Sequence, residues 1–354
     1  KNICKLFKII FNLENDIMKI AILGPVYSKT YFGGVATFNE NIAYAMKKKG
    51  HDVKIMETQK DAPDRTSRGV EISRLTYNNL RKHYDIVIAS LKYIMYLPFI
   101  NSDKKIYFLH GFYYMPEKGF FKTICALMFQ KFFIRKCDYV ISNSYFTSYI
   151  NYHAYNINAV GSVSLGVSYD FLDALSNYDK SVVRQNKKLL YVGRLVKAKS
   201  VEKILESLQL LDRSYELTVV GDGEYRQFLE KYAKDNELNV NFVGKINQDQ
   251  TIKYYLNSNV FISLNDAEPF GISYCEALIA GCKIISPNMG GQVEYLKKYP
   301  EQVRLVSVNA QDISKAIIQL CNVSTITNVN KEYFTYENTA NQIFKLIDNG
   351  RKRA

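Results

Sequence analysis

Short apolar runs alternate with longer stretches of helical spacing along the whole chain. In the first half these runs predict buried strands at Lys19–Gly24, Asp52–Met56, Asp85–Ser90, Lys105–His110, Tyr139–Ser142 and Ser162–Val167. In the second half they predict strands at Leu189–Gly193, Glu216–Val220, Asn239–Val243, Val260–Leu264, Cys282–Ser286 and Val303–Val306. Apolar strands separated by helical segments are typical of parallel sheets with helices on both faces. The pattern predicts an α/β fold.

The length and one polar stretch divide this pattern into two domains. A chain of 354 residues exceeds the size at which one hydrophobic core usually keeps growing. The polar segment Asp170–Lys188 separates the two sets of strands. We therefore expect one Rossmann-like domain at 18–175 and a second at 186–333. A segment at 1–17 precedes the first domain, and a helix at Phe334–Asp348 with a basic tail ends the chain.

The stretch from Phe261 to Gly291 carries the strongest candidate chemistry. It predicts a strand, a polar loop with Glu268, and a helix from Ile272 to Ala280 that contains Glu276. A helix N-terminus offers unpaired N–H groups and partial positive charge, which suit a phosphate. Two carboxylates would repel a phosphate unless they face the hydroxyls of an attached sugar. The arrangement suits a sugar nucleotide.

Two cations follow the first strand of the second domain, in the sequence YVGRLVKAKS. Arg194 and Lys199 are expected at the carboxyl end of that strand, on a loop entering the helix Val201–Leu211. An Arg fork and a Lys point charge can together clamp a diphosphate. Structural salt bridging is the competing interpretation of the same residues.

These two stretches resemble the E-x7-E region and the G-R-L-x-x-x-K signature of the family-4 (group 1) retaining glycosyltransferases. The resemblance covers nearly all of residues 18–348. It implies the GT-B architecture, two Rossmann-like domains facing across a cleft, with the last helix crossing back to the first domain. Ser200 departs from the Gly that the family usually has after the lysine.

The resemblance also implies a role for each matching residue. Arg194, Lys199 and the Phe270, Gly271 and Ile272 amides would stabilise the departing diphosphate. Glu276 would bind the ribose, Glu268 the donor sugar, and the backbone at Lys245 and Ile246 the nucleobase. Gly33 and Gly34 would approach the donor phosphate and the acceptor, and His110 the donor sugar. The implied reaction moves a sugar from a nucleoside-diphosphate sugar, UDP-linked in our prediction, to an acceptor hydroxyl with anomeric retention.

Blander interpretations remain open at this stage. Glycine pairs in tight turns are often only steric devices, a lone His is usually a satisfied polar residue, and the two Glu residues could be solvated. Two other functions are also compatible with such a chain. One is a sugar-nucleotide or glycan-binding partner subunit without turnover, and the other is a sugar-nucleotide epimerase, for which only His110 offers an acid or base.

Composition narrows the cofactors and the compartment. No D-x-D sequence occurs, and the six Cys form no C-x-x-C pair, so we expect no metal and no other cofactor. Reduced thiols and the absence of a membrane-length apolar run predict a cytoplasmic protein.

The distribution of charge indicates the partners. Residues 1–180 contain 24 Lys and Arg against 15 Asp and Glu, a balance of +9 out of +13. Phe residues interleave with Lys and Arg at 119–137, and 1–16 has apolar and basic positions at helical spacing. An anionic membrane surface fits this pattern, with the inner face of the plasma membrane and a glycan or lipid-linked acceptor of surface-polysaccharide synthesis as the expected setting. A core helix with cations at its edges is the alternative for 119–137. No nucleic-acid motif occurs, so nucleic acid is not an expected partner.

Overall fold

The computed structural model describes residues 17–28, 33–60, 64–112, 119–178, 184–324 and 328–349. The predicted amphipathic segment at 1–16 and the basic tail at 351–353 lie outside these ranges. None of the helices formed by the described residues is long and apolar enough to cross a membrane.

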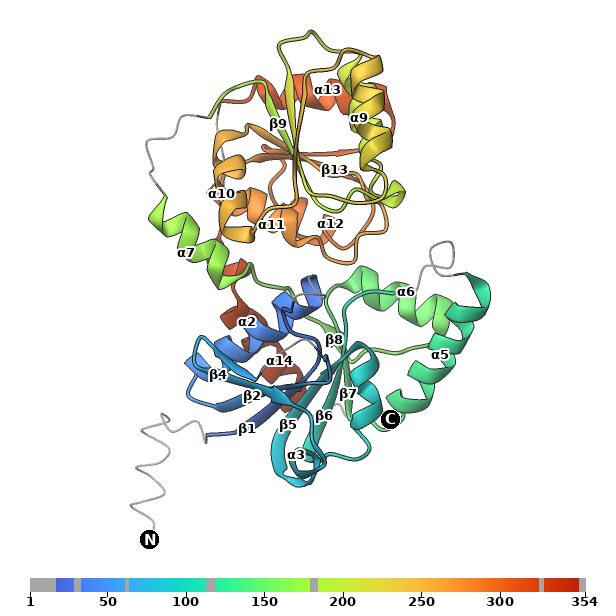
Figure 1. Ribbon diagram of the computed structural model, residues 1–354, viewed down its shortest axis with the longest axis vertical. Helices are drawn as coiled ribbons and strands as arrows, with labels where there is room; N and C mark the ends of the chain where they lie inside the picture. The colour runs from blue at the N-terminus through green and yellow to red at the C-terminus, as the bar shows by residue number, and fades with distance from the viewer. Residues whose placement is uncertain are drawn as a thin grey trace. The chain divides into compact units, whose positions relative to one another are not determined.

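An eight-stranded sheet is built from the first half of the chain (Figure 1). Its order is β3-β4-β2-β1-β5-β6-β7-β8. The strands are β1 (Lys19–Leu23), β2 (Asp52–Glu57), β3 (Arg65–Ser67), β4 (Val70–Arg74), β5 (His83–Ser90), β6 (Asn101–Leu109), β7 (Tyr139–Ser142) and β8 (Gly161–Ser162). β1 pairs in parallel with both β2 and β5, so the strand order reverses at β1 and β5.

The helices of this half connect the strands. They are α2 (Gly34–Lys48), α3 (Tyr77–Arg81), α5 (Phe120–Ile134), α6 (Tyr145–Tyr155) and α7 (Tyr169–Asn177), with a 3-10 turn η1 (Leu91–Tyr96). Several of these helices have either a glycine or a hydrogen-bonding side chain at the N-cap position. Ser144 caps α6, for example, because its hydroxyl accepts the Thr147 N–H at 2.9 Å.

The structure corrects the sequence prediction in two places. The antiparallel pair β3–β4 was not predicted. The strand predicted at Ser162–Val167 is wrong, since only Gly161 and Ser162 pair with β7. The rest of that apolar run packs on the chain's last segment: the Val167 N–H bonds to Phe334 O at 2.9 Å and the Ser164 N–H to Gln342 Oε1 at 3.0 Å. Residues 163–167 are therefore buried by contacts with the segment around Phe334 and the helix that contains Gln342, and not by strand pairing.

The second half forms a six-stranded parallel sheet in the order β11-β10-β9-β12-β13-β14. Its strands are β9 (Lys188–Val192), β10 (Glu216–Val220), β11 (Val240–Gly244), β12 (Val260–Ile262), β13 (Lys283–Pro287) and β14 (Val303–Val306). Its helices are α8 (Val201–Leu208), α9 (Arg226–Asp235), α10 (Gln248–Asn257), α11 (Ile272–Ile279), α12 (Val293–Leu296) and α13 (Ala310–Cys321). The 3-10 turns η2 (Lys197–Lys199) and η3 (Lys331–Phe334) and the helix α14 (Tyr336–Asp348) complete the described chain.

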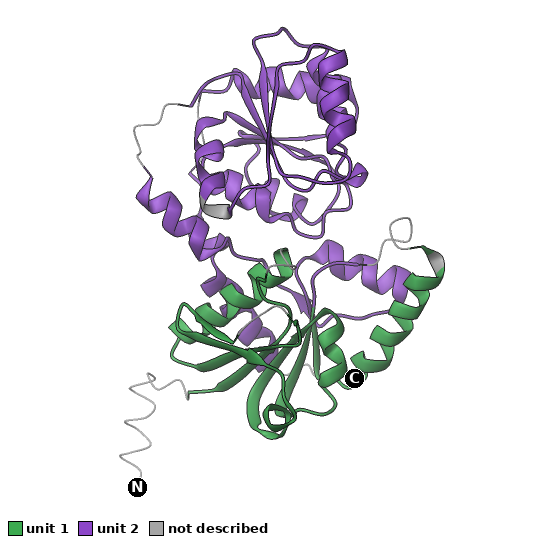
Figure 2. Ribbon diagram, in the orientation of Figure 1, with its two compact units in different colours: residues 1–108, 115–140, 351–354 green, residues 109–114, 141–350 purple. Residues whose placement is uncertain are grey.

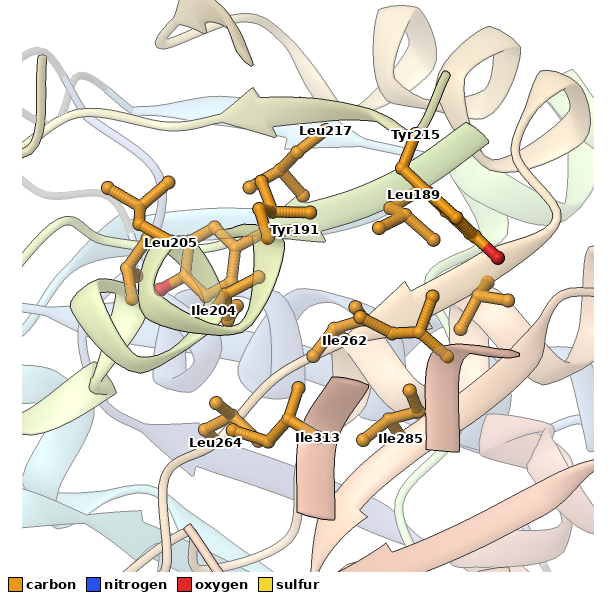
Figure 3. Close-up of a cluster of buried hydrophobic side chains, with 14 of the residues drawn as sticks. Leu189, Tyr191, Ile204, Leu205, Tyr215, Leu217, Ile262, Leu264, Ile285 and Ile313 are labelled. Atoms are coloured by element: carbon orange, nitrogen blue, oxygen red, sulfur yellow. The ribbon is translucent and has the colours of Figure 1, made fainter. Parts of the chain in front are cut away.

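Alternate residues of the second sheet form its principal core (Figure 3). Leu189 and Tyr191 of β9 point to the same face as Leu217 of β10 and Ile262 of β12, as the period of two in a strand requires. Helices α8, α9 and α13 cover this face with buried Val, Ile and Leu side chains. The opposite face presents Phe261, whose ring lies 5.4 Å from that of Tyr274 in α11.

Contacts group the chain into two compact units (Figure 2). The first consists of residues 1–108, 115–140 and 351–354, and the second of residues 109–114 and 141–350. The second unit therefore holds the whole six-stranded sheet together with β8, α6 and α14. The two parallel-sheet domains predicted from the sequence are present as two sheets, and their predicted boundaries remain predictions.

Candidate functional site

The six-stranded sheet reverses its strand order between β9 and β12. From β9 the chain proceeds to β10 and β11 on one side, and from β12 to β13 and β14 on the other. Ligands of open parallel sheets bind beyond the carboxyl ends of the strands at such a reversal. Arg194 and Lys199 follow β9, and Glu268 follows β12. The predicted cations and one predicted carboxylate therefore lie at the two strand ends that flank the reversal.

Lys199 and Glu268 form a direct ion pair. The Lys199 Nζ donates to Glu268 Oε2 at 2.5 Å, and their side chains are only 20% and 17% exposed. The Asn265 Nδ2 donates to the same oxygen at 3.0 Å. Partial burial makes such a pair stronger than one on the open surface. The salt bridge considered as the competitor of the diphosphate clamp thus exists, and its acidic member is the predicted sugar-binding residue itself.

Arg194 is exposed, and its carbonyl oxygen accepts the Tyr191 hydroxyl at 2.9 Å. Lys199 ends the turn η2, and Ser200 joins that turn to α8 with a φ of 51°. This left-handed conformation explains why glycine is common at the position, since a Cβ is disfavoured there.

The N-terminus of α11 directly follows the loop that carries Glu268. Gly271 precedes the helix with a φ of 85°, and no described side chain caps this end. A Cβ on Gly271 would lie 2.6 Å from the Tyr274 ring, so only glycine fits. The Phe270, Gly271 and Ile272 amides are therefore at the position where a helix N-terminus attracts an anion.

Glu276 lies deeper than the sequence suggests. Its side chain is 6% exposed, and its Oε2 accepts the Tyr255 hydroxyl of α10 at 2.9 Å. Burial of a carboxylate requires such hydrogen bonds. Tyr255 fixes the orientation of the predicted ribose-binding group.

Three buried tyrosines that the sequence analysis missed hold the site loops in place. The Tyr191 hydroxyl bonds to Arg194 O, the Tyr274 hydroxyl to Ser263 O at 2.6 Å, and the Tyr295 hydroxyl to Gly271 O at 2.8 Å. Burial, with the nearby Glu268 carboxylate as a further cause, raises the pKa of Tyr191, Tyr274 and Tyr295. They remain neutral hydrogen-bond donors to backbone carbonyls. The chain has 28 Tyr residues, so no sequence signal separates these three.

His110 lies next to the same loop within the second unit. A Cβ on Gly111 would approach Pro269 Cγ at 3.2 Å, and the Ser144 Oγ donates to Pro269 O at 2.6 Å. The Asn143 Nδ2 holds His110 O at 2.9 Å. Burial lowers the pKa of His110 to about 3, so its imidazole is neutral at pH 7.

The remaining predicted residues lie at strand or helix ends. Lys245 and Ile246 directly follow β11 and are exposed and partly exposed, with their backbone beyond the carboxyl end of that strand. Gly33 and Gly34 open α2 in the first unit, and a Cβ on Gly33 would meet nothing within 4 Å. The structure therefore joins Lys199 to Glu268 by an ion pair and places Glu268 in the loop before α11. His110 precedes Gly111, which lies against Pro269 of that loop.

Among the described residues, one group has the ligand atoms that a metal ion would need. His83, Asp85 and Asp103 lie within 4.8 Å of one another at the amino ends of β5 and β6, in the first unit. They are away from the carboxyl ends of the strands, where the predicted site residues lie. The metal-free reaction predicted from the sequence stays a prediction.

Comparison with known proteins identifies the class. Residues 178–333 match the family model described as "Glycosyl transferases group 1". An uncharacterized glycosyltransferase of Methanocaldococcus jannaschii is 25% identical over 79% of this chain and 83% of its own length. The resemblance to group 1 of the glycosyl transferases that the sequence indicated is confirmed for residues 178–333.

Two further proteins extend the comparison to the whole chain. An uncharacterized 41.2 kDa protein in the cps region of Klebsiella pneumoniae is 23% identical over 91% of this chain and 95% of its own length. The structure of Anabaena HepE in complex with UDP and glucose has a TM-score of 0.69 at 16% identity, covering 94% of this chain and 99% of that one. The GT-B fold predicted from the sequence is confirmed.

Proposed function

We propose that this protein transfers a sugar from a nucleoside-diphosphate sugar, UDP-linked, to an acceptor hydroxyl with retention of the anomeric configuration. The Lys199–Glu268 pair, together with the uncapped N-terminus of α11 that follows Glu268, carries the proposal. A cation for the phosphates and a carboxylate for the sugar hydroxyls stand within one hydrogen bond of each other. A sugar nucleotide has both matching groups, a phosphate and a hydroxyl-bearing sugar, joined by the bond between the sugar C1 and a phosphate oxygen.

In the proposed reaction the bond between the sugar C1 and the diphosphate oxygen breaks as the acceptor oxygen bonds to C1. Arg194, Lys199 and the α11 amides stabilise the negative charge that grows on the diphosphate. The acceptor's proton goes to the departing phosphate, so no side chain acts as a base. The low pKa of His110 supports this division, because a neutral imidazole with a pKa of about 3 is a poor base but a good hydrogen-bond partner for a sugar.

The same observation bears on the alternative of an epimerase. Epimerisation requires an acid and a base on either side of the sugar ring. Glu268 is already paired with Lys199, and His110 is a weak base. The site therefore favours transfer, and net formation of an epimer without release of nucleoside diphosphate would overturn it.

Two conservative variants test the roles of the carboxylates. Glu276→Gln keeps an oxygen that can accept the Tyr255 hydroxyl but loses the charge, so UDP and UDP-glucose should both bind roughly tenfold to a hundredfold more weakly. Glu268→Gln should weaken UDP-glucose but should not weaken UDP, because UDP has no sugar beyond its phosphates. Isothermal titration of each variant with each ligand gives the comparison.

Asp266→Asn, an exposed carboxylate in the same loop, serves as the control and should bind both ligands as the parent protein does. Equal loss of UDP affinity in both glutamate variants would refute the division of roles. Unchanged binding in both would make the two glutamates bystanders.

Metal independence belongs to the same proposal. The cations and helix amides at the site can neutralise a diphosphate without a divalent ion. Turnover should survive EDTA. Loss of turnover that Mn²⁺ or Mg²⁺ restores would contradict this part.

Helix α5 supports peripheral membrane binding for the same enzyme. Its exposed face carries Phe121, Met128 and Phe132, which are 78%, 67% and 62% exposed, while Thr123 and Gln130 are buried. Lys122 and Lys131 are exposed on the same helix. Exposed rings flanked by cations suit an anionic bilayer surface, and the buried polar side chains argue against an ordinary core helix.

Sedimentation with liposomes tests this arrangement. The protein should bind vesicles with phosphatidylglycerol, and binding should weaken as salt rises, because exposed charges are screened beyond about 10 Å at 0.1 M salt. Replacing Phe121 and Phe132 together with Ser should abolish binding. Equal binding to purely zwitterionic vesicles would contradict an electrostatic contribution.

A further inference from the structure

Helix α6 presents a row of exposed tyrosines. Tyr145, Tyr149 and Tyr152 are 74%, 61% and 49% exposed. Their spacing of four and three residues places them on one face of the helix. The opposite face buries Thr147 and Asn151. Exposed aromatic side chains grouped on one face generally mark a surface that binds something.

Two rings of this tyrosine face, those of Tyr149 and Tyr152, pack against a neighbouring ring. His153 lies between Tyr149 and Tyr152, with ring centroids at 4.3 and 4.9 Å. On the inward side Phe146 packs edge-on against Phe112 at 5.7 Å. Aromatic pairs at these separations attract one another, which favours the packed positions of Tyr149 and Tyr152.

The tyrosine face begins at the candidate donor site. Ser144, the residue before Tyr145, donates its hydroxyl hydrogen bond to Pro269 O, next to Glu268. The Glu294 carboxylate accepts the N–H groups of Tyr145 and Phe146 at 3.1 and 2.7 Å. All of these residues belong to the second unit (Figure 2). The face is therefore continuous with the loop that carries the proposed sugar-binding group.

The chemistry of α6 selects among possible occupants. Its eleven residues, YFTSYINYHAY, include no Lys, Arg, Asp or Glu. An anionic lipid surface or a nucleic acid would be met by cations, as on α5. Tyrosine offers an apolar ring face and a hydroxyl at its edge, which match the C–H face and the hydroxyl rim of a sugar. From Tyr145 to Tyr152 the helix rises about 10 Å, the scale of a short oligosaccharide.

We propose that Tyr145, Tyr149 and Tyr152 bind an uncharged oligosaccharide, the part of the acceptor that lies beyond the hydroxyl receiving the new sugar. This inference rests on the proposed transferase function and adds the substrate class of the acceptor. Because three rings lie along the face, an acceptor of several linked sugars should bind more tightly than a single sugar. The donor does not touch this face.

A glycan array tests the proposal on the full chain in the presence of UDP. At least one neutral oligosaccharide of three or more sugars should bind, and its affinity should fall roughly tenfold for Tyr149→Ala and again for Tyr152→Ala. Tyr77→Ala, which removes a 71% exposed tyrosine from α3, should bind as the parent does. The double variant carries both Tyr149→Ala and Tyr152→Ala. If it binds the array as the parent does, or if the parent binds no neutral glycan, the proposal is overturned.

Two further measurements distinguish failure of the glycan assignment from failure of the proposed transferase function or of folding. UDP and UDP-glucose titrations of the double variant should match the parent, as should its thermal midpoint. If the parent binds neither UDP nor UDP-glucose, the proposed function itself has failed. If the double variant instead loses self-association in sedimentation, or loses binding to zwitterionic vesicles, then the face serves a second copy or a membrane and the glycan assignment is wrong.

Discussion

The two sheets reverse their strand order in the same way, but different kinds of side chain lie at the two reversals. In the eight-stranded sheet the reversal at β1 and β5 is filled by neutral polar groups. Asn39 is fully buried there, its Nδ2 bonds to Pro25 O at 2.8 Å, and its Oδ1 accepts the Ser90 hydroxyl at 3.0 Å. In the six-stranded sheet the reversal at β9 and β12 carries a partly exposed ion pair, Lys199 with Glu268.

The difference shows how one topology supplies either a structural joint or a ligand site. Buried amide and hydroxyl groups that satisfy each other leave nothing for a ligand to replace. A charged pair near the surface keeps hydrogen-bonding capacity that a charged ligand can use. Topology locates a candidate site, and the side chains at the strand ends determine whether a ligand binds there.

The largest effect should come from removing the cation at the second reversal. Lys199→Ala should lower turnover with UDP-glucose by about 10²–10³, because a preorganised charge at the leaving group is lost. Lys197→Ala removes an exposed lysine two residues away on the same turn and should change turnover little. Steady-state kinetics of both variants measure the contrast, and equal losses would mean that only general positive charge matters.

Adding a side chain at the reversal between β1 and β5 should lower the stability of the fold and leave donor binding unchanged. A Cβ at Gly24 would lie 2.2 Å from Asn39 Nδ2, so Gly24→Ala must displace the buried amide and should cost about 2–3 kcal/mol in the free energy of unfolding. Gly33→Ala meets open space and should leave stability unchanged. Urea unfolding reports the difference, and UDP titration of Gly24→Ala below its transition should give the parent's affinity. A weakened UDP affinity would show that the first reversal also shapes the donor site.

The neutral His110 predicts a pH dependence of stability. Its pKa falls from an ordinary value near 6.5 to about 3 on folding, so between these pH values the unfolded chain binds a proton that the folded chain does not. The free energy of unfolding should therefore be full above pH 6.5 and decline toward pH 3, with a contribution of about 2 kcal/mol lost at pH 5. His110→Gln should remove this part of the decline in acid-unfolding titrations. An unchanged slope would mean that the imidazole is solvated.

The smallest effect concerns the tyrosines that hold the second site. Tyr295→Phe removes the hydroxyl that bonds to Gly271 O and should cost about 1 kcal/mol in stability while weakening UDP by a few fold. Tyr93→Phe is the matched change in the first unit, where the hydroxyl bonds to the Thr58 N–H at 3.1 Å. It should lose similar stability and no UDP affinity. Equal UDP affinities in the two variants would show that Tyr295 supports only the fold.

Local patterns predicted the sheets and the charged residues, but not the partners. Apolar runs such as the predicted strand Leu189–Gly193 indicate their own burial, and the spacing of Arg194, Lys199 and Glu268 around strand ends matched a known signature. The Asn39–Ser90 bond joins residues 51 apart, and the Ser144–Pro269 bond residues 125 apart. A single sequence holds no record of such pairings. The outward Phe residues of α5 were equally hidden, because their helical spacing is the same whether the face they share is buried or exposed.

In the proposed transferase, the ion pair between Lys199 and Glu268 would also select against simple anions. A simple anion such as inorganic phosphate could take Lys199 only by leaving the Glu268 carboxylate without its cation in a partly buried position. Separating a desolvated pair in this way is costly unless the incoming molecule satisfies both members. The proposed sugar nucleotide would do so, because its phosphates would replace the carboxylate at Lys199 and its hydroxyls would replace the ammonium at Glu268. In a cell rich in free phosphate, this pairing would favour the sugar nucleotide over the simple anion at Lys199.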